Sequence, residues 1–283
     1  MLIAQISDTH LRASGRLLHG QIDTARALDA CIAHLRRLDP APDLVLATGD
    51  LADGGLPEEY ARLRAAFDQL PMPVYVIPGN HDDREALRSS FADHGYLPAH
   101  GEFLHYTIED FPLRLIGLDT VIPGEVGGAL CPARLAWLGE RLDEQPKRPT
   151  LIFMHHPPFP TGIGFMDWPP LYGASELQEL VRRHPQVRQV VCGHIHRAIH
   201  VSWAGTTAAV APSVVYQMNL ALRPDDGFLL IDQPPAIALY LWRREFASGP
   251  VGYVSLIGRR ENKASLDAGP SVGGTGILRS GIL

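Results

Sequence analysis

Side chains of the kind that bind metal ions recur at five places along the chain, each directly after a short apolar run. They are Asp8 and His10, Asp50, Asn80 and His81, His155, and His194 and His196. Carboxylate, amide and imidazole donors without a thiolate suit Mn, Fe, Zn, Co or similar cations. If the apolar runs are strands of one α/β fold, their carboxyl ends meet where such folds bind ligands. The pattern therefore predicts one site built from residues that are far apart in the sequence.

Each block also has an ordinary structural explanation when it is taken alone. Asp8 suits a surface turn or a helix cap, and Gly49–Asp50 is a common turn dipeptide. The first glycine of Gly79–Asp82 permits close backbone approach. The two imidazoles of Gly193–His196 share one side if that segment is extended. It is the conjunction of all five blocks, each after an apolar run, that makes coincidence improbable.

The elements that must position these residues alternate between strands and helices. Six short apolar runs are typical of buried strands: Leu2–Ser7, Leu44–Thr48, Val74–Pro78, Leu113–Leu118, Leu151–Met154 and Val187–Cys192. Four stretches between them repeat apolar residues every three or four positions, which predicts helices: Ala25–Leu38, Glu58–Leu70, Pro132–Leu142 and Ser175–Arg183. This alternation is typical of an α/β protein.

After His196 the pattern changes to strands that are separated only by turn signals. The strands expected there are Ile199–Trp203, Thr206–Val210, Phe228–Ile231 and Ile237–Trp242. We interpret them as an antiparallel region. Two packed sheets flanked by helices accommodate both halves of the chain better than one doubly wound sheet. The expected fold is a four-layer α-β-β-α sandwich of two mixed sheets.

We expect a single domain over residues 1–257, followed by a tail. Residues 157–172 contain five prolines with Met166 and Trp168, and form either a lid over the site or a plain surface loop. Residues 258–283 are poor in core side chains, so they are predicted to be mobile or to serve as an oligomer arm.

Composition narrows the partners and the compartment. The 283 residues include 25 Lys and Arg against 31 Asp and Glu, a formal charge of -6. That balance disfavours a nucleic-acid polymer as partner and favours a small substrate. The odd number of widely spaced cysteines, Cys31, Cys131 and Cys192, implies no disulfide framework, so a reducing cytoplasm is expected. We expect no signal peptide and, because no run reaches 18 apolar residues, no membrane helix.

The five blocks match a known motif order. They read D-x-H, G-D, G-N-H, H and G-H-x-H, and in this order the chain resembles the calcineurin-like metallophosphoesterases over roughly residues 1–200. The amino-acid sequences of three segments look closest to bacterial class III cyclic-nucleotide phosphodiesterases and glycerophosphodiesterases: Ile6–His10, Ile77–Asp83 and Met154–Pro158.

The resemblance implies two divalent or trivalent metal ions with separate ligand sets. The first set is Asp8, His10, Asp50 and His196, and the second is Asp50, Asn80, His155 and His194. Asp50 would bridge the two ions. His156 follows His155 directly, and because side chains alternate along a strand, we expect it on the other face in a packed or hydrogen-bonded role.

The resemblance also implies hydrolysis of a small phosphodiester by attack of a metal-bound hydroxide. Cyclic nucleotides such as cAMP and glycerophosphodiesters are the substrates it suggests. His81 is expected beside the phosphate, where it stabilises the transition state or protonates the leaving group. Asp53 either orients His81 or only shapes a turn. Arg12 and His19 are expected to contact substrate together with Asn80 and His81.

Three other functions stay open at this point. The same fold serves phosphomonoesterases, and it serves nucleases, although the acidic balance of this chain disfavours a nucleic-acid substrate. It also serves as a non-catalytic, metal-stabilised binding scaffold in relatives that lack ligands. A homodimer or a higher homo-oligomer is compatible with the proline-rich loop and the antiparallel second half.

Overall fold

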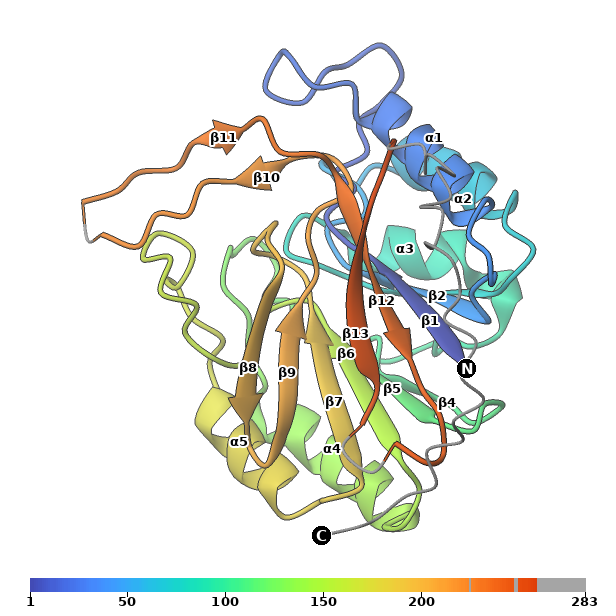
Figure 1. Cartoon of the computed structure of the whole chain (residues 1–283), viewed down its shortest axis with the longest axis vertical. Helices are drawn as coiled ribbons and strands as arrows, with labels where there is room; N and C mark the ends of the chain where they lie inside the picture. The colour runs from blue at the N-terminus through green and yellow to red at the C-terminus, as the bar shows by residue number, and fades with distance from the viewer. Residues whose placement is uncertain (224, 247–248, 259–283) are drawn as a thin grey trace, which may run out of the picture.

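The amino-terminal sheet has five strands in the order β13-β12-β1-β2-β3 (Figure 1). Three of them are parallel: β1 (Leu2–Ile6), β2 (Leu44–Thr48) and β3 (Val74–Ile77). The other two, β12 (Ala236–Leu241) and β13 (Val251–Leu256), join antiparallel at the β1 side. This computed structural model describes residues 1–223, 225–246 and 249–258. The tail expected from residue 258 onward therefore lies, after its first residue, outside the described residues.

The second sheet has six strands in the order β4-β5-β6-β7-β9-β8. Its parallel centre consists of β5 (Arg114–Leu118), β6 (Thr150–Met154), β7 (Val187–Cys192) and β9 (Thr206–Val210). The antiparallel edges are β4 (Tyr106–Ile108) and β8 (Ile199–Trp203). Both sheets are therefore mixed, as expected.

Helices lie beside each sheet (Figure 1). The first sheet carries α1 (Thr24–Leu35), α2 (Pro57–Phe67) and α3 (Arg84–Ser90), and the second carries α4 (Pro132–Glu144) and α5 (Ala174–Arg182). A short 3-10 turn, Ala92–His94, follows α3. Prolines begin α2 and α4, where a missing backbone N–H costs no helical hydrogen bond. Within the described residues, no helix is both long enough and apolar enough to cross a membrane.

Polar contacts tie the two sheets together inside an otherwise apolar core. The Tyr106 hydroxyl donates to the carbonyl of Val76 across the sheets at 2.6 Å. Gln5 on β1 donates to the Thr48 hydroxyl and to the Cys192 carbonyl, both at 2.8 Å. All these groups are buried and partnered, so they cost little and hold the sheets in register directly below the strand ends. The α/β sandwich is confirmed.

The second half of the chain does not form one antiparallel region, and that part of the prediction was wrong. The pair β8 and β9 extends the second sheet, whereas β12 and β13 cross over to the first. Between them a hairpin of β10 (Gln217–Met218) and β11 (Leu230–Ile231) projects from the body (Figure 1). Local patterning indicates strands but not the sheet that each one joins, because pairing across the fold is a long-range choice.

Candidate metal centre

The predicted donors all lie just beyond the carboxyl ends of strands. Asp8 and His10 follow β1, Asp50 follows β2, Asn80 and His81 follow β3, His155 follows β6, and His194 and His196 follow β7. These strands come from both sheets, so the residues gather where the two sheets meet at one end of the sandwich. Apart from Asn80 and His81, all of these side chains are buried.

One group of donors surrounds His10. Its Nε2 lies 3.2 Å from Nε2 of His196 and 3.7 Å from Oδ2 of Asp50. Oδ1 of Asp8 lies 3.4 Å from Nε2 of His196. Two ligands that share one cation at ordinary bond lengths lie roughly 3.0–3.5 Å apart, so these spacings suit a common ion.

A second group of donors surrounds His155. Its Nε2 lies 3.4 Å from Oδ2 of Asp50 and 3.2 Å from Oδ1 of Asn80. A ring nitrogen of His194 comes within 4.8 Å of one of His155. The same oxygen of Asp50 therefore faces both groups. Its other oxygen accepts the backbone N–H of His81 at 2.9 Å, which fixes the carboxylate in this orientation.

The histidine tautomers leave the inner nitrogens as acceptors. Nδ1 of His155 donates to the Thr48 carbonyl at 2.8 Å, and Nδ1 of His196 lies 3.2 Å from the Tyr216 carbonyl. Nδ1 of His10 lies 3.2 Å from Oδ1 of Asp53. Such outer hydrogen bonds place the lone pair on Nε2, as in most metal-binding histidines. Two lone pairs that face each other repel unless a cation lies between them, so the donor set fits metal ions.

Burial sets the charges of this cluster. Burial lowers the pKa of His194 to about 3, so its ring is neutral and can act as a ligand. Burial, with help from the nearby Asp50 carboxylate, raises the pKa of Asp8 to about 6. Burial opposes charge on His155 too, but the Asp50 carboxylate outweighs it and raises the pKa of His155 to about 9. The Nε2 of His155 therefore has to release a proton before it can bind a cation. Buried carboxylates that lie close together repel each other, and a bound cation would relieve that repulsion.

The backbone at the donors is strained. Five donors have left-handed φ angles: Asp8 at 56°, His10 at 40°, Asp50 at 50°, His194 at 74° and His196 at 53°. Such conformations are uncommon for residues other than glycine and cost of order 1–3 kcal/mol each. They account for five of the seven such non-glycine residues found in the described chain. Strain concentrated on the donors indicates a functional site.

The glycines of the motifs allow the loops to approach closely. A Cβ on Gly79 would lie 2.3 Å from both the backbone nitrogen and Oδ1 of Asp50. A Cβ on Gly193 would lie 2.0 Å from Oγ of Ser7. No other residue fits at either position without moving a donor loop.

His81, the predicted catalyst, sits at the exposed edge of the cluster. Its Nδ1 donates to the Asp53 carbonyl at 3.1 Å and lies 3.5 Å from Oδ1 of Asp53. Its ring packs edge-on to His10, with 4.7 Å between ring centroids. The side chain is 41% exposed, so it can reach a bound substrate.

Asp53 contacts more partners than the sequence predicted. Besides His81, it lies against Nδ1 of His10, and it forms an ion pair with Arg12. Although burial opposes its charge, the hydrogen bond with His10 and the ion pair with Arg12 lower the pKa of Asp53 to about 2. Its carboxylate thus stays ionised between a donor of the first group and His81.

His19 and His156 occupy different places. His19 is exposed beside the Tyr216 ring, 6.2 Å between centroids, at the rim of the cluster. The ring of His156 lies beside His155 and His194, with 4.9 and 4.8 Å between ring centroids. Its nitrogens have other partners: Nε2 donates to the Val126 carbonyl at 3.0 Å and Nδ1 pairs with the Thr120 hydroxyl at 2.7 Å. Both nitrogens of His156 are satisfied, as predicted, although its ring stays beside the second donor group and does not lie on the other face.

Two supporting residues were missed by sequence reasoning. Buried Asp82 accepts the backbone N–H groups of Leu51, Ala52 and Gly79 at 2.8–3.1 Å, and so binds the Asp50 loop to the Asn80 loop. Its position directly after Asn80 and His81 was the available signal. Tyr216 packs on His196 with 4.3 Å between ring centroids, and nothing in the sequence around it marks that role.

Comparisons with known proteins agree with this geometry. The calcineurin-like phosphoesterase family model matches residues 1–198. The chain is 38% identical over 262 residues to a probable glycerophosphodiester phosphodiesterase from Arcobacter nitrofigilis, covering 92% of this chain and 95% of that protein. It is 33% identical over 217 residues to the 3',5'-cyclic adenosine monophosphate phosphodiesterase of Escherichia coli K12, covering 77% of each.

The fold is also found among solved structures. A dimetal phosphatase from Danio rerio superposes with a TM-score of 0.60 at 15% identity, over 90% of this chain and 98% of that one. The family model spans most of the chain and includes all five donor blocks. The chain therefore belongs to the calcineurin-like phosphoesterase family.

Proposed function

We propose that this protein is a dinuclear-metal-dependent phosphodiesterase that hydrolyses small phosphodiesters. The observation that carries the proposal is the single oxygen of Asp50 that faces both His10 and His155, at 3.7 and 3.4 Å. A carboxylate so placed suits a bridge between two cations. The named activities of the two relatives, on glycerophosphodiesters and on cyclic AMP, support the same substrate class.

The ligand sets proposed from the family follow the two groups of donors. The first ion would be held by Asp8, His10, Asp50 and His196, and the second by Asp50, Asn80, His155 and His194. When bound, the two cations would draw charge from the phosphoryl oxygens and lower the pKa of the attacking water. Mn, Fe, Zn and Co all suit this mixture of nitrogen and oxygen donors.

His81 is the proposed catalyst outside the ligand sets. Its Nδ1 is engaged by Asp53, whereas its Nε2 makes no hydrogen bond within the described part of the chain. That nitrogen is free to donate to a phosphoryl oxygen or to protonate the departing alkoxide. Asp53, with its carboxylate 3.5 Å away, holds the ring in this orientation.

Charge around the site favours a diester over a monoester. Arg12 is paired with Asp53, and Arg84 with the buried Asp119 at 2.5 and 2.9 Å. Both guanidinium groups near His81 are thus already neutralised. A dianionic monoester would need additional positive charge, whereas a monoanionic diester needs less. Arg12 and His19 stay proposed substrate contacts at the rim.

A panel of substrates tests the proposal. Metal-supplemented protein is assayed with bis-p-nitrophenyl phosphate, p-nitrophenyl phosphate, cAMP, a glycerophosphodiester and linear DNA. We expect the diesters to be hydrolysed with higher kcat/KM than the monoester. A strong preference for the monoester would replace the proposal with a phosphomonoesterase. Turnover of linear DNA that falls steeply with salt would indicate a nuclease, and no turnover at all would indicate a binding scaffold.

A further inference from the structure

An apolar cavity of about 140 Å³ lies directly beside the second donor group. Its inner wall includes His194 and Ile195, which follow β7, and its outer wall is the proline-rich segment 157–171. His156, which follows β6, and Ala174, the first residue of α5, complete the lining. Most of the side chains that line it are apolar: Pro157, Pro158, Phe159, Met166, Leu171 and Ile195. The cavity is therefore a side chamber of the candidate metal centre.

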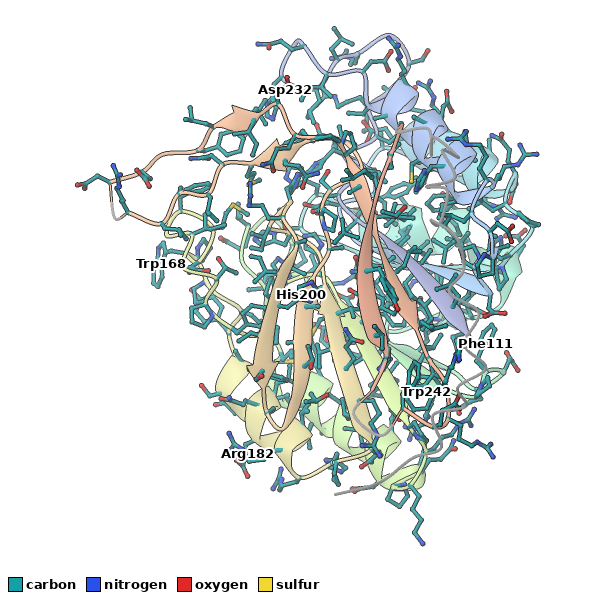
Figure 2. All side chains as sticks on the ribbon, viewed as in Figure 1. Phe111, Trp168, Arg182, His200, Asp232 and Trp242 are labelled. Atoms are coloured by element: carbon teal, nitrogen blue, oxygen red, sulfur yellow. The ribbon has the colours of Figure 1, made fainter. Side chains whose placement is uncertain are left out.

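Hydrogen bonds hold the outer wall in place. Asp167 accepts the backbone N–H groups of Thr161 and Gly162, each at 2.8 Å, which closes the segment into a turn. At its far end the Tyr172 N–H donates to the Gly128 carbonyl at 2.8 Å. The large apolar side chain of Trp168 points outward and is 74% exposed, away from the cavity (Figure 2). The cavity thus exists before any ligand arrives, which limits the entropy lost on binding.

The size and lining of the cavity suit a flat apolar ring. Apolar cavities of roughly 150 Å³ accept benzene-sized ligands. Proline and aromatic faces pack well against planar rings. Of the polar side chains that line it, Asp167 and Thr161 bond to each other, and His156 bonds to Thr120 and Val126. A polyol such as glycerol would therefore find few free partners there, which is unfavourable.

The surroundings of His81 are different in character. A larger cavity of about 440 Å³ borders His81 and is lined by Asp83, Glu85 and Glu102. Its carboxylates favour polar or cationic groups over an apolar ring. Of these two chambers beside the donors, only the one at His194 offers a ring an apolar environment.

We propose that the cavity beside His194 is a specificity subsite that receives an apolar ring carried by one ester group of the phosphodiester substrate. This inference deepens the proposed function and rests on it. The side chains of the segment 157–171 and Ala174 are then specificity determinants, because their contacts are with the substituent and not with the phosphate.

Two diesters with the same leaving group isolate this subsite. Bis-p-nitrophenyl phosphate and methyl p-nitrophenyl phosphate both release p-nitrophenol, but only the first retains an aromatic group. Burying one ring is expected to favour the diaryl ester by roughly 10- to 100-fold in kcat/KM. Their intrinsic reactivities differ as well, but that difference is the same for every variant and cancels when the ratio is compared between variants.

Ala174→Leu fills the cavity, and Ser175→Leu is its matched control. Ser175 is the next residue of α5, is exposed, and does not line the cavity. We expect Ala174→Leu to reduce the preference for the diaryl ester at least about 5-fold with little change for the methyl ester. Ser175→Leu should keep the wild-type ratio. An unchanged ratio in Ala174→Leu would overturn the subsite.

Binding without turnover provides a second readout. Calorimetry with phenylphosphonate and methylphosphonate on metal-loaded protein should show tighter binding of the phenyl compound, and Ala174→Leu should remove the difference. If Ala174→Leu does not fold, Met166→Ser serves instead and should weaken phenyl binding. Failure of wild-type protein to hydrolyse either diester would refute the proposed function. Equal affinity for the two phosphonates would refute the subsite.

Discussion

We propose that some residues of the centre hold metal and that others act on substrate. Asn80 lies 3.2 Å from Nε2 of His155 within the second donor group, whereas the adjacent His81 points its ring to the exposed edge. Asn80→Ala should lower the metal content by about one ion per chain and the rate by at least about 100-fold. His81→Ala should keep the full metal content and lose roughly 100-fold or more in kcat.

Elemental analysis beside steady-state kinetics separates these two variants. Loss of metal in His81→Ala would make His81 a ligand, and full metal content in Asn80→Ala would remove Asn80 from the second set. Near-wild-type turnover in both would contradict the whole assignment.

Asp53 is a third single residue with a testable role, because its carboxylate lies 3.2 Å from His10 and 3.5 Å from His81. We expect Asp53→Asn to weaken metal affinity roughly 10- to 100-fold, since a histidine ligand loses the carboxylate that orients it. Competition with a chromogenic chelator measures that affinity. Asp143→Asn is the matched control, because Asp143 makes a 3.1 Å contact with the unrelated His184 at the surface. Equal affinity in wild-type protein and Asp53→Asn would restrict Asp53 to shaping its turn.

Most donors could be predicted from the sequence because their motifs combine glycine, strand end and ligand in short blocks. The hydrogen bonds that orient the donor histidines from behind could not be predicted. His155 is held by the carbonyl of Thr48 and His196 by that of Tyr216. A backbone carbonyl exists at every residue, so nothing in the sequence distinguishes the two that matter.

At the scale of elements, the strand-to-loop junctions determine the geometry of the site. Gly193 connects β7 to the His194 loop, and a Cβ there would collide with Ser7 at 2.0 Å. Gly193→Ala should destabilise the fold by about 1–3 kcal/mol and displace the His194 loop. Gly139→Ala is the control, because its Cβ would meet Leu180 at an ordinary 3.7 Å within α4 and should stabilise that helix by about 0.5–1 kcal/mol.

Urea unfolding and metal content measure the two effects. The same stability and metal content in Gly193→Ala as in wild-type protein would show that the junction tolerates a side chain.

The strand-to-loop junctions were partly predictable from the sequence, because a short apolar run marked every strand that carries a donor. The short β4 and the exposed β13 were missed, because β13 has four exposed residues out of six and pairs only along one edge.

For the molecule as a whole, the pH dependence of stability involves a titrating group outside the candidate metal centre. His105, which precedes β4, stacks on Trp137 of α4 and accepts the Asp119 N–H at 3.0 Å. Burial lowers the pKa of His105 to about 4. Since the unfolded chain takes up this proton near pH 6.5 and the folded chain does not, stability falls as the pH drops from 6.5 toward 4.

The fall in unfolding free energy between pH 7 and pH 5 should be about 2 kcal/mol smaller in His105→Asn than in wild-type protein. Urea titration of metal-depleted protein at both pH values measures it, because the metal ligands then titrate alike in both proteins. An identical pH dependence would mean that His105 is protonated equally in the folded and unfolded chains.

The sandwich as a whole follows from two alternating halves of strands and helices, and its layers were predictable. The crossing of β12 and β13 back to the first sheet was not, because an apolar strand suits either sheet equally. That crossing places β12 beside β1. The strand that leads to Asp8 and His10 thereby has a partner on both sides, which makes the first donor block a rigid part of the core.

We propose that two metal ions, bridged by Asp50, make this chain a phosphodiesterase. The most direct test titrates metal-depleted protein with Mn²⁺ while the hydrolysis of bis-p-nitrophenyl phosphate is followed. We predict little activity before the first equivalent, a rise through the second and a plateau at two ions per chain. Activity without metal, a plateau at one ion, or no hydrolysis at any metal content would contradict the claim.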